Sequence, residues 1–327
     1  MDVADNIKPL SSHFIPLSPQ TSATHPPTPI IQRDTSKTMT YLTSPFTTET
    51  PPPLTQFYDQ LVDWRTPVFT ALIYVVTVKR LAKGIKGPPP SSTSDHWTNH
   101  GAFKAFVVLH NALLAVFSGV TFVGMARDFY ANLRDRDLVD ALCDRNEQFW
   151  NASLFYWAFP FYLSKYYEIV DTAILLMKGR KPSLLQTYHH AGAIISMWLC
   201  IRGRTTAVWI FVLFNSFIHT LMYTYYILTT LSIHPPRSIK QTLTSMQIGQ
   251  FIIGLAISLF NPTLQVAAAL FPQSRNALTC LKGPEVVGRE TAGYEVAAHV
   301  LMTMYLVPLM ALFRGFARRT YGKTKKA

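Results

Sequence analysis

The chain has 327 residues, of which 49% are hydrophobic and 15% charged, and its formal net charge is +12. With a mean hydropathy of +0.15, it is too apolar and too basic for an ordinary cytosolic enzyme. Runs of about 20 apolar residues predict helices that cross a membrane. Lys and Arg residues lie at the ends of these runs, where they face phospholipid headgroups, so no nucleic-acid partner is expected.

The first 56 residues differ in composition from the rest of the chain. They contain 10 of the 22 prolines and many Ser and Thr residues, and they cannot bury enough apolar surface to offset the loss of chain entropy. We therefore predict a disordered tail over 1–56, a helical transmembrane domain over 57–318 and a short basic cytosolic tail over 319–327.

The domain is predicted to be all-α, a polytopic bundle of seven transmembrane helices. Each predicted span is about long enough to cross a hydrocarbon core of ~30 Å. The spans lie near 67–84, 102–124, 152–177, 184–201, 206–231, 243–265 and 294–316. Lys79 and Arg80 shorten the apolar part of the first span, and Pro262 and Pro272 are expected to end or kink the sixth.

The distribution of positive charge predicts the orientation of the chain. Lys and Arg gather after the first span, before the fourth and in the C-terminal tail, and such segments stay in the cytosol. The last residues, 323–327, read KTKKA, which resembles a signal for retrieval to the endoplasmic reticulum, although orientation alone explains a basic tail equally well. Cys143 and Cys280 fall on the opposite, non-cytosolic side, where both a disulfide and two separate thiols remain open.

Ionisable residues inside predicted spans indicate a functional site, because they are costly in a bilayer. In the third span, Lys165, Glu168, Asp171 and Thr172 share one face of a helix. The alternative is a structural ion pair that fixes the helix register. In the fourth span, Gln186 lies one turn before the adjacent His189 and His190.

The fifth and sixth spans carry further polar residues at helical spacing. Asn215, His219, Met222, Tyr223 and Tyr226 recur every three or four residues and form a polar stripe. Gln247 and Gln250 lie one turn apart, where hydrogen bonds between helices are the simpler explanation. We expect His110 and His299, each alone in its span, to be packed core residues.

These motifs together resemble the ELO family of very-long-chain fatty acid elongases. The resemblance covers about residues 60–320 and comprises KxxExxDT, a His pair, NxxHxxMYxYY and a Gln-rich sixth span, in that order. The chain departs from the usual HxxHH motif because Gln186 occupies the first His position, a variant that also occurs in the family. This departure bears on the acyl substrate more than on the reaction.

The resemblance implies a 3-ketoacyl-CoA synthase of the endoplasmic reticulum membrane whose bundle encloses an acyl tunnel. Acyl-CoA and malonyl-CoA would condense to 3-ketoacyl-CoA, CO2 and CoA, with no metal or redox cofactor. The implied partners are membrane lipid and the ketoacyl reductase, dehydratase and enoyl reductase of the elongation cycle, and a homo-oligomer is left open.

The resemblance also implies roles for the residues of the site. His189 would accept the acyl group or act as a general base, His219 would position or activate the malonyl unit, and His190 would support the site. Lys165, Glu168 and Asp171 would shape the electrostatics, with Asp171 orienting an imidazole. The expected substrate-binding residues are Thr172, Gln186, Asn215, Met222, Tyr223, Tyr226, Gln247 and Gln250. The cations expected to meet the CoA phosphates are Lys178, Arg180, Lys181, Arg237 and Lys240.

Two other classes of protein were considered. A di-iron membrane desaturase or hydroxylase also uses histidine boxes, but it needs about eight imidazoles. This chain has 10 His residues, but two of them, His13 and His25, lie in the predicted tail, and most of the others lack the spacing of a histidine box. A transporter or receptor is the non-enzymatic alternative, although a transporter is expected to show repeats or broken helices in matching halves, and none is visible in the sequence.

Overall fold

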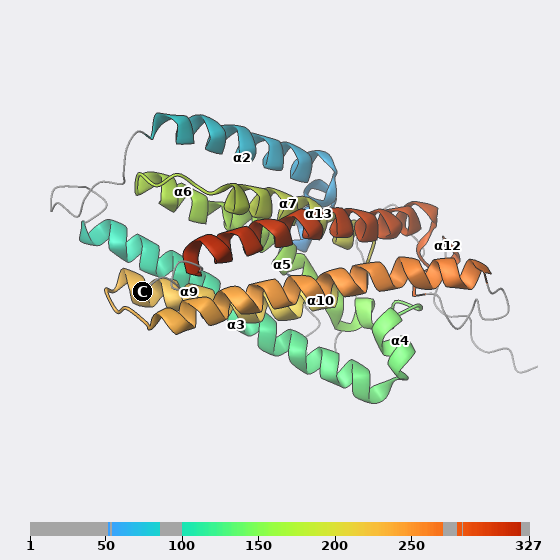
Figure 1. The fold of residues 1–327 in the computed structure, drawn as a ribbon. Coiled ribbons are helices and arrows are strands. Elements are labelled where there is room, and N and C mark those ends of the chain that lie inside the picture. Colours follow the sequence, from blue (N-terminus) through green and yellow to red (C-terminus); the bar gives the residue numbers. More distant parts are fainter. Residues whose placement is uncertain (1–51, 53, 86–99, 271–279, 283, 322–327) are drawn as a thin grey trace, which may run out of the picture. The chain divides into compact units, whose positions relative to one another are not determined.

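The computed structural model describes residues 52, 54–85, 100–270, 280–282 and 284–321. Every regular element within these ranges is a helix (Figure 1), which confirms the predicted all-α class. Most of the predicted N-terminal tail and the KTKKA motif lie outside the described residues. The last helix, α13, ends at Tyr321, three residues beyond the predicted domain boundary at 318.

Long helices occupy the positions of all seven predicted spans. They are α2 (Arg65–Gly84), α3 (Gly101–Asp135), α5 (Phe155–Tyr167) with α6 (Ile169–Met177), α7 (Leu184–Arg202), α8 (Val208–Ile210) with η4 (Phe211–Asn215) and α9 (Ser216–Thr230), α10 (Arg237–Leu270), and α13 (Arg289–Tyr321). Shorter elements are η1 (Thr55–Phe57), α1 (Tyr58–Val62), α4 (Leu138–Cys143), η3 (Trp150–Leu154) and α12 (Pro284–Val287).

The lengths and composition of these helices show a multi-pass membrane protein. Among the described residues, four helical segments are long and apolar enough to cross a bilayer: α3, the segment from α8 through α9, α10 and α13. The α1 and α2 pair, bent by 67°, makes a fifth if it counts as one span. Two predicted spans are not among these segments: α5 and α6 are separated by a break, and α7 begins with polar turns. The count of seven spans therefore stays a prediction.

Pro262 does not end the sixth predicted span. An end or a kink was predicted there, and α10 continues to Leu270. In a bundle, neighbouring helices can satisfy the backbone group that a proline leaves free, so a helix tolerates it. Pro272 lies outside the described residues.

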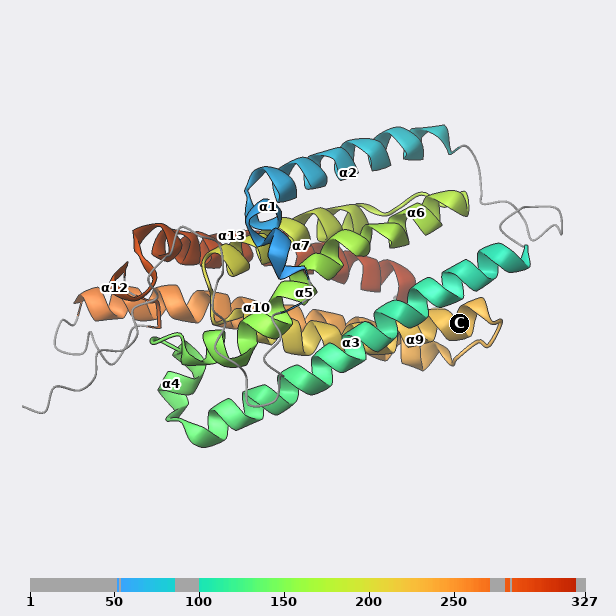
Figure 2. The same cartoon turned by 180° about the vertical axis from the view of Figure 1, so that it is seen from behind.

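The packing of the helices brings distant parts of the chain together. Helix α3 packs along α9, while α13 packs against both α7 and α10 (Figures 1 and 2). Because successive long helices alternate in direction, the segments 178–183 and 231–236 lie at one end of the helices. The segments 136–149, 203–207 and 280–282 lie at the opposite end.

A π-helical segment lies within the fifth long helical segment, directly before α9. The five residues of η4, Phe211–Asn215, form a π-helical segment that runs directly into α9. Such segments change the angle at which the following side chains project and are frequent at functional sites. Here the segment ends at Asn215, whose side chain contacts α5.

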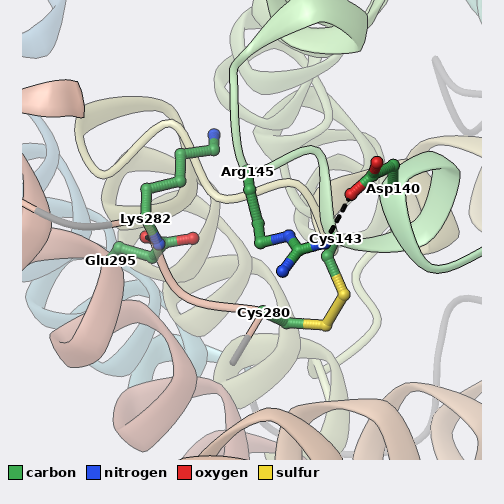
Figure 3. The surroundings of a disulfide bond; sticks show 6 residues. All are labelled: Asp140, Cys143, Arg145, Cys280, Lys282 and Glu295. Atoms are coloured by element: carbon green, nitrogen blue, oxygen red, sulfur yellow. Dashed lines mark hydrogen bonds and ion pairs between the residues drawn. A yellow bond between two sulfur atoms is a disulfide. The ribbon is translucent and has the colours of Figure 1, made fainter. Parts of the chain in front are cut away.

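A disulfide joins Cys143, at the end of α4, to Cys280, before α12 (Figure 3). Their Cα atoms are 4.6 Å apart, within the usual range for a disulfide. Arg145 donates a hydrogen bond to Asp140 beside it. The backbone N–H of Lys282, next to the bridge, donates to the carboxylate of Glu295 at 3.0 Å. The structure therefore selects the disulfide from the two states that the sequence left open.

Candidate active site

A buried ion pair lies at the junction of α5 and α6. Lys165 Nζ donates to Glu168 Oε1 at 2.7 Å and to Asn215 Oδ1 at 3.0 Å. Lys165 and Glu168 are 4% and 2% exposed, so neither charge is solvated. His219 Nδ1 lies 3.6 Å from the same Glu168 oxygen. The predicted grouping of these residues therefore exists in the fold, and it links α5 to the polar stripe of η4 and α9.

Asp171 forms the centre of a second polar group. Its Oδ1 lies 2.8 Å from His110 Nε2, and its Oδ2 accepts a hydrogen bond of 2.7 Å from Tyr223. The other His110 nitrogen, Nδ1, lies 3.2 Å from the hydroxyl of Tyr167. Asp171 was expected to orient an imidazole of the site. The imidazole to which it is hydrogen-bonded is that of His110, which the sequence had assigned to the packed core.

Helix α7 presents the His pair. Its N terminus is capped by Ser183, whose hydroxyl accepts the backbone N–H of Gln186. Gln186 Nε2 donates to Thr172 Oγ1 at 3.1 Å, and the same oxygen lies 2.9 Å from the hydroxyl of Tyr74 on α2. The Gln186 side chain, in the first position of the motif that usually reads HxxHH, therefore bonds α7 to α6. Through Thr172 it is also linked to α2.

His189 has a partner from the last helix. Its Nδ1 lies 2.8 Å from the hydroxyl of Tyr305 on α13, and that hydroxyl also donates to the backbone carbonyl of His189 at 3.1 Å. The imidazole of His190 lies beside His189, with ring centroids 5.6 Å apart, and is nearly buried. The His190 ring also lies near that of Tyr74, with centroids 6.2 Å apart, so the two adjacent histidines have different neighbours, as their spacing on a helix requires.

A cavity of about 530 Å³ connects these groups, a size typical of small-molecule sites. Helices α3, α6, α7, α9, α10 and α13 line it. Most of the predicted site residues are on its wall: Glu168, Asp171, Lys178, Arg180, Gln186, His189, His190, Asn215, His219, Met222, Tyr223, Tyr226, Lys240, Gln247 and Gln250. Imidazoles from α7 and α9 therefore face one shared space.

Four predicted residues do not line the cavity. Lys165 and Thr172 lie behind the wall, bonded to the lining residues Glu168 and Gln186. Arg237 instead donates to the carbonyl of Thr320 and lies over the ring of Tyr321. Lys181 does not line the cavity either. Three of the five predicted cations therefore line it.

Those three cations mark one end of the cavity. Lys178 and Arg180 follow α6, and Lys240 lies in the first turn of α10. Burial lowers the pKa of the Lys178 ammonium, and the positive charge of nearby Arg180 lowers it further. Such a cluster favours an anion, because an anion between the two groups relieves their repulsion.

Several residues around the site were not predicted as site residues from the sequence. His110 and Tyr305 contact Asp171 and His189, Asn111 lines the cavity, and Tyr74 bonds to Thr172. These residues come from α2, α3 and α13, outside the recognised motifs. The only available signal was the position of His110 and Asn111 as adjacent polar residues within an apolar run.

The fold and the cavity define a helical membrane protein with an imidazole-lined cavity that carries positive charge at one end. The chain belongs to the ELO: GNS1/SUR4 family, which it matches over residues 60–327. No solved structure matches it.

Curated relatives carry consistent names. Fatty acid elongase sre1 of Dictyostelium discoideum is 31% identical over 192 residues, which cover 58% of this chain and 67% of that protein. Fatty acid elongase 2 of Trypanosoma brucei brucei is 28% identical over 231 residues, covering 70% and 79%. Very long chain fatty acid elongase 6 of Drosophila melanogaster is 30% identical over 154 residues, covering 47% and 49%.

Proposed function

We propose that this fatty acid elongation enzyme is a 3-ketoacyl-CoA synthase, which condenses acyl-CoA with malonyl-CoA. Family membership and the elongase names of its relatives support the elongation reaction. The observation that carries the condensing step is the convergence of His189 and His219, from two helices, on one cavity. A condensing enzyme must bring an acyl carbon and a malonyl-derived carbanion together in such a space.

Each of the two imidazoles has one role in the proposed reaction. The thioester carbon of acyl-CoA bonds to a nitrogen of His189, and its bond to sulfur breaks, so CoA leaves as a thiolate. The malonyl unit, positioned by His219, loses CO2, and the resulting carbanion attacks the acyl carbon. The bond to His189 then breaks, the imidazole is regenerated and 3-ketoacyl-CoA is released.

The walls of the cavity suit both parts of the substrate. Lys178, Arg180 and Lys240 would bind the CoA phosphates at one end. Ile218, Leu243 and Phe251 supply apolar surface on the wall of the cavity, as a fatty chain requires. The cation end would open to the cytosol of an endoplasmic reticulum membrane. The Cys143–Cys280 disulfide, at the opposite end of the helices, suits an oxidising lumen.

The alternative enzyme is a di-iron desaturase, which would need imidazoles placed around two irons. Among the residues that the structure describes, no group of three or more His, Cys, Asp or Glu side chains is placed to hold a metal ion. Measuring iron in purified protein separates the two reactions, because a desaturase needs near-stoichiometric iron and the condensation needs none.

The test uses purified protein with acyl-CoA and malonyl-CoA and without NADPH. The expected product is 3-ketoacyl-CoA, with CO2 released in equal amount. His189→Ala should abolish the product while keeping the thermal unfolding profile. His234→Ala, at an exposed position between α9 and α10, is the matched control and should retain activity. Full turnover by the His189 variant would overturn this assignment.

A further inference from the structure

Tyr305 holds His189 through two contacts made by one hydroxyl group. Its oxygen lies 2.8 Å from His189 Nδ1 and 3.1 Å from the backbone carbonyl of the same residue. Tyr305 is 9% exposed and does not line the cavity. It therefore contacts the imidazole from behind the wall, where no substrate is expected to reach it.

The position of Tyr305 is fixed by its neighbours on α7. At Gly192, a Cβ atom would lie 2.2 Å from the Tyr305 ring, so the glycine makes room for the close approach of α13. The ring of Tyr188 stacks on that of Tyr305 with centroids 5.6 Å apart, and its hydroxyl donates to the Tyr305 carbonyl. The hydroxyl of Tyr305 consequently has little freedom to turn away from His189.

The number of protons that these groups can donate determines which nitrogen of the His189 imidazole carries the ring proton. A tyrosine hydroxyl carries one proton, and a backbone carbonyl can only accept. Because Tyr305 donates its proton to the carbonyl of His189, its oxygen must act as the acceptor toward Nδ1. Both contacts are satisfied together only if Nδ1 carries the ring proton, which leaves the Nε2 lone pair free.

We infer that Tyr305 is a positioning residue that holds His189 in the Nδ1–H tautomer and presents Nε2 as the nucleophile. The inference rests on the proposed function, since it specifies which nitrogen bonds to the acyl carbon. When Nε2 attacks the thioester, the bond from carbon to sulfur breaks and CoA leaves as a thiolate. The positive charge of the acyl-imidazolium is then shared with Tyr305 through the Nδ1–H bond, until the carbanion displaces the imidazole.

The first test measures catalysis. Tyr305→Phe keeps the ring in its packing position but removes the hydroxyl. We expect kcat to fall by about tenfold to 100-fold, the range for losing a residue that orients a metal-binding imidazole, while the KM for acyl-CoA stays close to that of the unaltered protein. Formation of the acyl-enzyme from acyl-CoA alone should slow by the same factor.

Tyr188→Phe is the matched control. It removes one bond to the Tyr305 backbone, but it leaves the ring stacking that holds Tyr305 in place and both contacts of Tyr305 with His189. A role in packing alone predicts similar losses for both variants, whereas orientation of His189 predicts a large loss only for Tyr305→Phe. Equal kcat values for Tyr305→Phe and the unaltered protein would overturn the inference.

The second test does not require activity. In protein labelled with 15N at histidine, the ring nitrogens of His189, assigned by their loss in His189→Gln, should report a protonated Nδ1 and an unprotonated Nε2. Observation of the opposite tautomer would overturn the inference even if Tyr305→Phe fails to fold. If the unaltered protein shows the expected tautomer but forms no 3-ketoacyl-CoA, the proposed function fails while the role of Tyr305 in orienting His189 stands.

Discussion

Lys165 and Glu168 form an ion pair within the helix bundle, with 2.7 Å between Nζ and Oε1 and both side chains almost fully buried. Removing one partner leaves an unpaired buried charge, which costs about 3–5 kcal/mol. We expect Lys165→Met and Glu168→Leu each to lower the thermal unfolding temperature of the purified protein in detergent.

Removing both charges together gives the control for this pair. The double variant carrying Lys165→Met and Glu168→Leu has no unpaired charge and should be more stable than Lys165→Met alone, although its activity should still be lost. Strictly additive losses of stability would contradict an ion pair that is neutralised internally.

How far the sequence predicts this site depends on whether the partners share a helix. Lys165 and Glu168, and Gln186 and His189, are spaced by helical turns, so their grouping follows from the helical period. The contacts of Asp171 with His110 and of His189 with Tyr305 span 61 and 116 residues. They depend on which helices pack together, and no local pattern encodes this packing.

The fold was predictable to a similar extent. Long apolar runs predicted where the long helices lie, because a helix that crosses lipid needs about 20 apolar residues. The break between α5 and α6 and the π-helical segment before α9 were not predicted. Glu168, at the break, and Asn215, at the end of the π-helical segment, both accept hydrogen bonds from Lys165, and local propensity does not report the contact between the two helices.

The cations at the end of the cavity should determine the affinity for CoA substrates. We expect Lys178→Gln, Arg180→Gln and Lys240→Gln each to raise the KM for malonyl-CoA by on the order of threefold, the effect of losing about 0.6 kcal/mol. The effect should shrink at high salt, which screens charge. KM values measured at low and high ionic strength test this prediction.

Two further cations provide matched controls. Lys181 and Arg237 lie in the same segments but do not line the cavity. Lys181→Gln and Arg237→Gln should therefore leave the KM close to that of the unaltered protein. Equal effects at all five positions would indicate a general attraction of anions rather than a phosphate site.

Gln186 should influence the choice of acyl chain more than the reaction itself. Its side chain lines the cavity and donates to Thr172. Gln186→His should retain activity but shift the ratio of kcat/KM between two acyl-CoAs by about tenfold, the size of effect expected from a small change in a pocket wall. Competition assays with a panel of acyl-CoAs measure this ratio; complete loss of activity would show that the residue has a different role.

The disulfide should contribute to stability without taking part in the reaction. Cys143 and Cys280 are separated by 137 residues, and closing so long a loop stabilises a folded protein by about 2–5 kcal/mol. Cys143→Ala and Cys280→Ala should lower the unfolding temperature by similar amounts, with no further loss in the double variant. Alkylation of the denatured, unreduced protein should modify Cys200 alone, and labelling of all three cysteines would contradict the bridge.

Transfer of the acyl chain to His189 is the central chemical claim, and mass spectrometry of the acyl-enzyme tests it most directly. Protein incubated with acyl-CoA alone should release CoA and gain a single acyl group on the peptide that contains His189. Malonyl-CoA added afterwards should remove this group as 3-ketoacyl-CoA. CoA release that begins only when malonyl-CoA is present, with no modified peptide at any time, would contradict the account.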